Sequence, residues 1–245
     1  MTFDDPGFLD LRGLFRDPDM FDSRSRWAAA GFQVSNRSSN GKIMVASHPS
    51  VRGLLFKKYT SDVSSRTQRE NYECRLKGSR RLRDFISGRG LSRVVVPCKW
   101  ILELPRELSR RGPILLVEQL DLLENEQTVA AYQNIEVELL KELCTVLFAF
   151  RGMDSNAKNL PFLVDGRIGL VDTEHWDRGT SRDYLHHVGE HMSAERRKIA
   201  KKIFQQLRDG KSALGDLIAG PYGGGKRGWD DFLDDEYTSS SSSSS

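Results

Sequence analysis

The stretch RGMDSNAKNLPFLVDGRIGLVDTEHW, residues 151–176, places Asp154, Asn159 and Asp172 around a short hairpin pattern. Asp154 precedes Asn159 by five positions, and Asp172 follows Asn159 by thirteen. Two short apolar runs flank an Asp-Gly pair at 165–166, which favours a two-residue hairpin turn. Each of these polar residues alone is explained by a turn or a helix cap, because Asp and Asn suit both. Their joint spacing favours a chemical role.

Upstream of this stretch, the chain has a pattern of short strands around one helix. Turn-rich segments separate three strand candidates, GFQV, KIMVA and LLFKKYT, between residues 31 and 60. Two more strand candidates lie at 94–104 and 114–120. A helix is predicted over 67–86, with arginines on one side and an apolar side made by Tyr72, Leu76, Leu82, Phe85 and Ile86. Five antiparallel strands and one helix would form a compact first part.

Downstream, the pattern is mainly helical. Apolar residues at helical spacing predict helices at 125–132, 135–150 and 183–207, with a shorter one at 212–219. Residues 1–30 have no sustained period, so we expect short helices or an extended arm packed on the main body.

The end of the chain has a different composition. Residues 220–245 are rich in glycine, then acidic, and finish in seven serines. Such a segment cannot bury enough apolar surface to offset the entropy of ordering, so we expect a flexible, disordered tail.

Composition bounds the class of protein. With 245 residues, 38% apolar and 29% charged, the chain can bury a core and is expected to be globular. Three widely spaced cysteines favour a reducing compartment over a disulfide framework. The acidic amino terminus does not resemble a secretory signal, and no apolar run reaches the roughly 20 residues of a membrane span. A cytoplasmic location is expected, with export by a non-classical route left open.

Charge gives a weaker indication of partners. A net charge of +3 makes nucleic acid an improbable partner. The arginine-rich part of the predicted helix, residues 75–83, is compatible with an acidic partner. A solvated helix face with apolar residues beneath it is the favoured interpretation of those arginines.

The order of these elements and the spaced polar residues resemble the protein-kinase-like superfamily. In that family a catalytic-loop aspartate is followed five positions later by an asparagine, and a metal-binding aspartate lies after an intervening hairpin. The resemblance implies an α+β, two-lobed fold, with a small antiparallel sheet and one helix at 31–120 and a reduced, mainly helical lobe at 121–219. It also implies ATP and Mg²⁺ as cofactors, with Asn159 and Asp172 holding the metal and Asp154 orienting or deprotonating the attacking hydroxyl.

The same resemblance assigns a phosphate-binding lysine. The sequence LLFK at 54–57 stands where the family has its strand motif V-A-I-K. Lys57 would therefore bind the α- and β-phosphates of ATP. Glu73, sixteen residues further on and inside the predicted helix, would be its ion-pair partner, with Glu70 as the alternative. By residue type alone, Lys57 is also compatible with a solvated strand lysine beside Lys58.

The resemblance places the adenine site at the strand candidate 114–120. Val117 would line the back of the adenine pocket. Backbone groups from Glu118 to Leu120 would pair with adenine, and Glu124 would contact the ribose.

Several positions depart from the pattern of the family. The H-R-D triplet is Gly-Met-Asp at 152–154, and the position two after that aspartate, a lysine in many protein kinases, is Asn156. The D-F-G motif is Asp-Thr-Glu at 172–174, which is closer to the aminoglycoside and choline kinase branch. The segment expected to cover the phosphates, 35–41, has one glycine. Three functions therefore stay open: a kinase acting on protein Ser or Thr hydroxyls, a small-molecule kinase, and an inactive pseudokinase that serves as a binding module.

Two other patterns are weaker. Residues 220–226 resemble the start of a P-loop, but Arg227 replaces the required Ser or Thr, so a glycine-rich turn is favoured. His186, His187 and His191 include a pair at helical spacing but no third metal ligand at a recognised spacing. A polar helix face is the favoured interpretation of these histidines.

Overall fold

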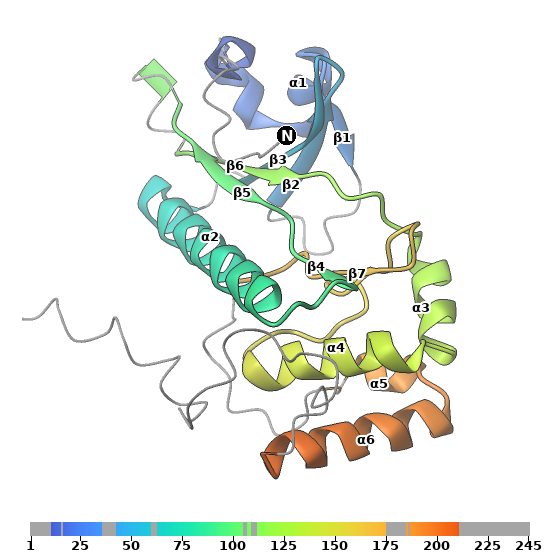
Figure 1. The fold of residues 1–245 in the computed structure, drawn as a ribbon. Coiled ribbons are helices and arrows are strands. Elements are labelled where there is room, and N and C mark those ends of the chain that lie inside the picture. The colour runs from blue at the N-terminus through green and yellow to red at the C-terminus, as the bar shows by residue number, and fades with distance from the viewer. Residues whose placement is uncertain are drawn as a thin grey trace, which may run out of the picture. The chain divides into compact units, whose positions relative to one another are not determined.

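The computed structural model of the chain describes residues 11–15, 17–35, 43–59, 63–104, 107–108, 112–174, 185 and 187–210. Contacts between Cα atoms divide the chain into residues 1–213 and 214–245, and all described residues belong to the first of these units. Its fold is mixed α+β, with a five-stranded antiparallel sheet and several helices (Figure 1). None of the helices in the described part is long and apolar enough to cross a membrane.

The sheet has the order β1-β2-β3-β6-β5, and all its neighbouring strands are antiparallel. The strands are β1 (Gln33–Ser35), β2 (Ile43–His48), β3 (Val51–Tyr59), β5 (Lys99–Leu102) and β6 (Ile114–Glu118). The single strand predicted over 94–104 is wrong, since it consists of β4 (Val94–Val95) and β5 with a break between them. Pro97 lies in the break, where its missing N–H cannot donate to a strand ladder.

The two faces of the sheet bury different partners. Side chains alternate along β3, so Leu54 and Phe56 lie on one face while Leu55 and Lys57 lie on the other. The first face is covered by three short helices, η2 (Leu11–Leu14), η3 (Pro18–Asp22) and α1 (Arg24–Ala29). Their core is aromatic: the fully buried rings of Phe15 and Phe56 lie 5.8 Å apart. Each such ring stabilises the packing by about 1.5–3 kcal/mol.

Helix α2 (Ser65–Gly88) covers the second face and runs beside β5 (Figure 1). Ser64 caps its start, because the Ser64 hydroxyl accepts the Thr67 N–H at 3.1 Å. Its buried side chains recur every three or four residues, as expected of one helix face: Gln68, Tyr72, Arg75, Ser79, Leu82 and Ile86. The placement of Arg75 on a solvated arginine face is therefore corrected, since Arg75 is only 9% exposed.

The remaining described helices are α3 (Asn125–Gln133), α4 (Val137–Ala149), α5 (Val188–His191) and α6 (Ala194–Arg208). α4 packs against α6, and α3 packs against α5. The single helix predicted over 183–207 is wrong, because Met192 is extended and Ser193 begins a new helix by accepting the Arg196 N–H at 3.3 Å. The short helix predicted over 212–219 lies outside the described residues, as do residues 36–42 and the tail from 220.

The predicted hairpin is present, with a longer turn than expected. Phe162 bridges Ile168 across the turn, and β7 (Ile168–Gly169) pairs in parallel with β4. The Leu163 N–H donates to the Arg167 carbonyl at 2.8 Å, which leaves three residues, 164–166, in the connection. Gly166 has φ +86°, the left-handed conformation that such a three-residue turn requires. The expectation of a two-residue turn is corrected accordingly.

Candidate active site

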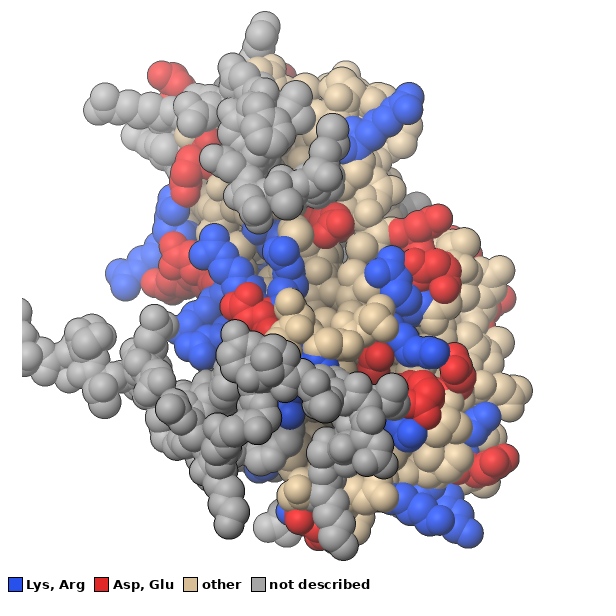
Figure 2. Space-filling view, viewed as in Figure 1, with Lys and Arg blue, Asp and Glu red and all other residues tan. Residues whose placement is uncertain are grey.

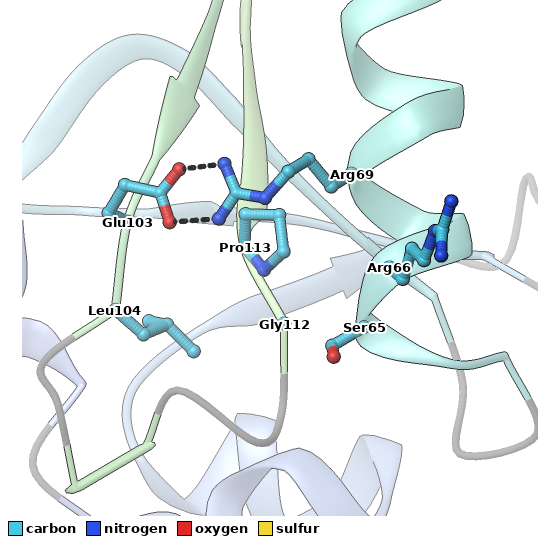
Figure 3. Close-up of a pocket in the computed structure, with 7 residues that line it drawn as sticks. All are labelled: Ser65, Arg66, Arg69, Glu103, Leu104, Gly112 and Pro113. Carbon is cyan, nitrogen blue, oxygen red and sulfur yellow. Dashed lines mark hydrogen bonds and ion pairs between the residues drawn. The ribbon is translucent and has the colours of Figure 1, made fainter. Parts of the chain in front are cut away.

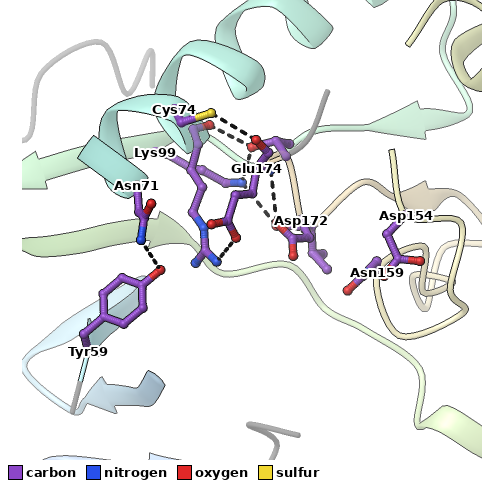
Figure 4. Close-up of polar contacts among 11 residues, drawn as sticks. Tyr59, Asn71, Cys74, Lys99, Asp154, Asn159, Asp172 and Glu174 are labelled. Carbon is purple, nitrogen blue, oxygen red and sulfur yellow. Dashed lines mark hydrogen bonds and ion pairs between the residues drawn. The ribbon is translucent and has the colours of Figure 1, made fainter. Parts of the chain in front are cut away.

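Five charged side chains lie together where the segment after β7 passes α2 and the sheet. Lys57 and Lys99 each interact electrostatically with Asp172 and Arg75. Arg75 also forms an ion pair with Glu174. In Figure 4, Asp172 lies between Lys99 and Glu174 on one side and Asp154 with Asn159 on the other. We call the set Lys57, Arg75, Lys99, Asp172 and Glu174 the charge cluster.

Backbone hydrogen bonds fix the position of Asp172. The Val171 N–H donates to the Asn159 carbonyl at 3.0 Å, and Lys99 Nζ donates to the Val171 carbonyl at 3.1 Å. The Glu174 N–H donates to Asp172 Oδ1 at 3.2 Å. Burial alone would raise the pKa of Asp172, but the positive charges of Arg75 and Lys99 and the Glu174 N–H hold that pKa below its usual value. Asp172 is therefore a stable anion.

Thr173 ties this segment to the first part of the fold. Its side chain is fully buried, and Oγ1 donates to the Arg75 carbonyl at 2.7 Å while accepting from Lys99 Nζ at 2.7 Å. The hydroxyl thus makes two hydrogen bonds, one to α2 and one to β5.

Thr173→Val is expected to lower the free energy of unfolding by about 1–3 kcal/mol. Valine has nearly the same shape, but it leaves the buried Nζ of Lys99 and the Arg75 carbonyl each short of one partner. Urea denaturation of the full chain measures the loss. Thr145→Val is the matched control, because Thr145 is equally buried but only bonds the Lys141 carbonyl of its own helix at 2.8 Å. Equal losses in the two variants would contradict this role of Thr173.

Arg75 and Glu174 form the most buried of the ion pairs in the described part. The distance from Arg75 Nη2 to Glu174 Oε2 is 2.5 Å, and the two side chains are 11% and 20% exposed. The Cys74 thiol also donates to the Glu174 carbonyl, at 3.0 Å. Among the described residues, however, Nε of Arg75 is buried without a hydrogen-bond partner.

The two lysines of the charge cluster are unfavourably placed for carrying a charge. Burial, and then the charge of Arg75, lowers the pKa of Lys57 to about 8, against a smaller opposite effect of Asp172. Burial, followed by the charge of Lys57, lowers the pKa of Lys99 well below its ordinary value. Three basic side chains thus lie with two carboxylates, and an additional anion would stabilise the charged forms of the two lysines.

The loop after α4 holds Asp154 and Asn159 together. Asp154 Oδ1 accepts the Asn156 N–H at 3.0 Å, and Asp154 Oδ2 accepts from Asn159 Nδ2 at 2.8 Å (Figure 4). Because a carboxylate can only accept, this bond fixes which end of the Asn159 amide faces Asp154. The Asn159 amide oxygen is left for another partner. The predicted spacing of five residues therefore brings these two side chains into direct contact.

The predicted ion pair of Lys57 with a glutamate of α2 is not formed. Glu73 is exposed, and the alternative, Glu70, pairs with Arg66 at 2.9 Å. Glu73 precedes Arg75 by two residues, which separates them by about 200° around the helix. Because Arg75 faces the charge cluster, Glu73 faces away from it. We correct the assignment accordingly: an arginine, and no glutamate of α2, lies opposite Lys57.

The predicted adenine site has fewer open backbone groups than expected. The Glu118 N–H donates to the Cys98 carbonyl at 2.9 Å, and the Gln119 N–H donates to the Gly53 carbonyl at 2.8 Å. The Glu118 carboxylate accepts the Cys98 N–H at 2.9 Å. The amides of Glu118 and Gln119 are therefore engaged within the protein, whereas the Leu120 N–H has no partner among the described residues.

The two side chains predicted at this site lie as follows. Val117 is 3% exposed and packs with Tyr72 and Leu115 on the face of the sheet that carries Lys57. Glu124 caps α3 through a reciprocal capping box with Gln127. Glu124 therefore has a structural role at the start of α3, and its contact with a ribose stays a prediction.

Neither Arg75 nor Lys99 was predicted from the sequence to be a site residue, although the sequence pattern indicates that both side chains face inward. Arg75 stands three residues after Tyr72 and seven before Leu82, the spacing of one helix face. Lys99 is two residues before Ile101 in an otherwise apolar strand, so it shares the inward face. A charged residue at an apolar position of an amphipathic pattern is the indication in each case.

Other candidate sites in the described part are separate from the charge cluster. A pocket of about 310 Å³ lies at the start of α2 and contains none of the predicted site residues (Figure 3). It is lined by Ser65, Arg66, Arg69, Glu103, Leu104, Gly112 and Pro113. No group of three or more His, Cys, Asp or Glu side chains is arranged for a metal among the residues described. His186 and residues 220–226 fall outside the described residues.

Within the arginine-rich part of α2, residues 75–83, Arg80 and Arg83 are exposed, and two surface ion pairs of the helix lie before that part. Arg66 pairs with Glu70, and Arg69 forms two bonds with Glu103, at 2.5 and 2.7 Å. On the face seen in Figure 2, positive and negative side chains are interspersed. An acidic partner for this helix therefore stays a prediction.

Comparison with known proteins adds no assignment. No protein-family model matches the chain, and no curated protein matches it. The function is therefore inferred from the geometry of the described residues.

Proposed function

We propose that this chain is an ATP- and Mg²⁺-dependent phosphotransferase with a reduced, two-lobed protein-kinase-like fold. The observation that carries the proposal is the grouping of Lys57, Asn159 and Asp172, which come from three distant parts of the sequence. Lys57 and Asp172 are close enough for the charge of each to shift the pKa of the other. Asn159 is joined to the residue before Asp172 by a backbone hydrogen bond. The sheet with α2 would be the first lobe, and the helices from α3 onward the second.

The donor atoms at this site suit Mg²⁺, which prefers hard oxygen ligands. Asp172 is an anion with Oδ2 not committed to the Glu174 N–H, and the amide oxygen of Asn159 is turned away from Asp154. These two oxygens would hold the metal. When bound, Mg²⁺ would neutralise charge on the β- and γ-phosphates.

The side chains around these oxygens have complementary tasks. Lys57 would bind phosphate oxygens, and burial strengthens that interaction because the local dielectric constant is low. Asp154 is exposed at the edge of the site, so an incoming hydroxyl group can reach it. It would orient that hydroxyl and accept its proton. The chemistry is positioning and charge stabilisation, as expected of phosphoryl transfer.

The proposed acceptor is a Ser or Thr hydroxyl of a protein. A small-molecule hydroxyl is the alternative, supported by Glu174 in the Asp-x-Glu motif and by the absence of the H-R-D arginine. An inactive pseudokinase is the second alternative. It is supported by Arg75 in place of a glutamate opposite Lys57 and by the engaged amides of Glu118 and Gln119.

Incubation of the full chain with γ-labelled ATP and Mg²⁺ tests the proposal. Label is expected on the chain itself or on a generic protein substrate, and Asp154→Ala is expected to reduce the rate by about 10²- to 10⁴-fold. Label on aminoglycosides, choline or other small alcohols would favour the small-molecule alternative. A rise in melting temperature with nucleotide but no transfer would establish the binding module. The absence of both transfer and a rise in melting temperature would refute the proposal.

A further inference from the structure

We propose that Arg75 is a phosphate-binding residue that Glu174 holds until a nucleotide binds, and that it makes the site select ATP over ADP. This inference rests on the proposed function, because it assigns a second cation to the same phosphate chain. It replaces the family's lysine–glutamate pair by two cations, Lys57 and Arg75, that act on the same ligand.

The first support is an unsatisfied donor. Arg75 is nine-tenths buried, and its guanidinium bonds Glu174 through Nη2 while Nε has no acceptor in the described part of the chain. A buried N–H without an acceptor is unfavourable, and native proteins keep few of them. A guanidinium presents its donors as a planar fork that matches two oxygens of a phosphate. A phosphate oxygen would supply the acceptor that Nε lacks.

The second support is the balance of charge. Lys57, Arg75 and Lys99 are three basic side chains that lie together with only two carboxylates, those of Asp172 and Glu174. A phosphate chain would bring negative charge to this basic set of side chains. Each added phosphate increases this attraction, so a site with two phosphate-facing cations discriminates between triphosphate and diphosphate more than a site with one.

The third support is the position of Glu174. Its carboxylate occupies the guanidinium of Arg75 at 2.5 Å, and its backbone is fixed by the Cys74 thiol and by Asp172. A phosphate that binds both Nε and Nη2 of Arg75 would compete with the Glu174 carboxylate for Nη2. Removing the Glu174 charge should therefore release Arg75 for the nucleotide.

A purely structural ion pair gives a different expectation. If Arg75 and Glu174 only tie α2 to the segment after β7, removal of either partner lowers stability and leaves the relative affinity for ATP and ADP unchanged. A phosphate-binding Arg75 predicts opposite effects, with weaker ATP binding after loss of the arginine and tighter ATP binding after loss of the glutamate.

Titration calorimetry of the full chain with Mg²⁺ plus ADP or a non-hydrolysable ATP analogue separates these cases. The wild-type protein is expected to bind the ATP analogue at least about tenfold more tightly than ADP. Arg75→Gln should reduce that ratio to near one, with Arg75→Lys intermediate, and Glu174→Gln should raise the affinity for the ATP analogue several-fold. Arg83→Gln, an exposed arginine of the same helix, is the control and should leave both affinities unchanged.

The outcomes distinguish this inference from the proposed function. If the wild-type protein binds neither nucleotide, both fail. If it binds nucleotide and Arg75→Gln keeps the wild-type ratio, or Glu174→Gln weakens binding of the ATP analogue, only the assignment of Arg75 fails. Should Arg75→Gln not fold, as shown by circular dichroism, the sign of the change in Glu174→Gln decides.

Discussion

Asp172→Asn is expected to lower the rate of phosphoryl transfer by about 10²- to 10³-fold, a loss of the same order as that expected for Asp154→Ala. The substitution keeps the shape of the side chain and removes its negative charge. The amide oxygen that replaces the carboxylate is a weaker Mg²⁺ ligand. Transfer from γ-labelled ATP at saturating Mg²⁺ measures the change. Because Asn159 supplies only a neutral oxygen, it cannot compensate.

Asp84→Asn is the matched control for this substitution. Asp84 is exposed on α2, and its replacement should leave the transfer rate within about twofold of the wild-type rate because surface substitutions are nearly neutral. The pKa of Asp172 is below its usual value, so its charge is retained throughout the ordinary pH range of the assay. A transfer rate for Asp172→Asn equal to that of Asp84→Asn would contradict the proposed role of Asp172 in phosphoryl transfer.

Lys57→Met is expected to weaken binding of the ATP analogue by tenfold or more at pH 7 and to remove the dependence of that binding on pH near 8. The free site has a Lys57 pKa of about 8, and a bound phosphate would raise this pKa. Below pH 8 the free lysine already carries its proton, so its contribution to affinity is constant. Above pH 8 the proton must be taken up on binding, and affinity falls by up to about tenfold per pH unit. Calorimetry from pH 6.5 to 10 measures both effects.

The neighbouring lysine supplies the control. Lys58 lies on the opposite face of β3, where Nζ donates to Gln68 Oε1 and to the Pro113 carbonyl at 3.1 Å. Lys58→Met should lower the melting temperature. It should leave unchanged both the affinity for the ATP analogue at pH 7 and the fall of that affinity above pH 8. A pH dependence that persists in Lys57→Met would assign the proton uptake to another group. Arg75 on α2, Lys99 on β5 and Asp172 also face Lys57, and of these Lys99 is the candidate.

Folding stability has its own pH dependence at the same lysine. The pKa of Lys57 is about 8 in the folded chain and 10.5 in the unfolded chain, so the unfolded chain binds the proton more tightly. The contribution of Lys57 to the free energy of unfolding is therefore unfavourable below pH 8 and becomes less so as pH rises from 8 to 10.5. Lys57→Met should remove this dependence.

Period and turn patterns predicted much of the fold. The five strands, the long α2 and the hairpin after Asn159 follow from alternation, helical spacing and an Asp-Gly pair, which are local properties of the chain. The errors lie where a local pattern was extended too far. Proline divided the strand over 94–104, and an extended Met192 divided the helix over 183–207.

The candidate site was predicted less completely, because the partner of a charged residue is a tertiary property. The contact of Asp154 with Asn159 follows from a spacing of five residues within one loop. The partner of Lys57, in contrast, depends on which face of α2 turns toward the sheet. The family resemblance favoured Glu73, whereas the apolar spacing through Tyr72 and Leu82 places Arg75 there. The helical period of the buried side chains, and not the expected residue type, therefore indicates which side chain of α2 lies opposite Lys57.

A crystal structure of the full chain with Mg²⁺ and a non-hydrolysable ATP analogue is the most direct test that the charge cluster binds nucleotide phosphates. The expected density places the phosphate chain against Lys57 and Arg75, with the metal between Asp172 and the Asn159 amide oxygen. An analogue bound in the pocket between Ser65 and Glu103, or an intact Arg75–Glu174 ion pair with phosphates elsewhere, would contradict the account.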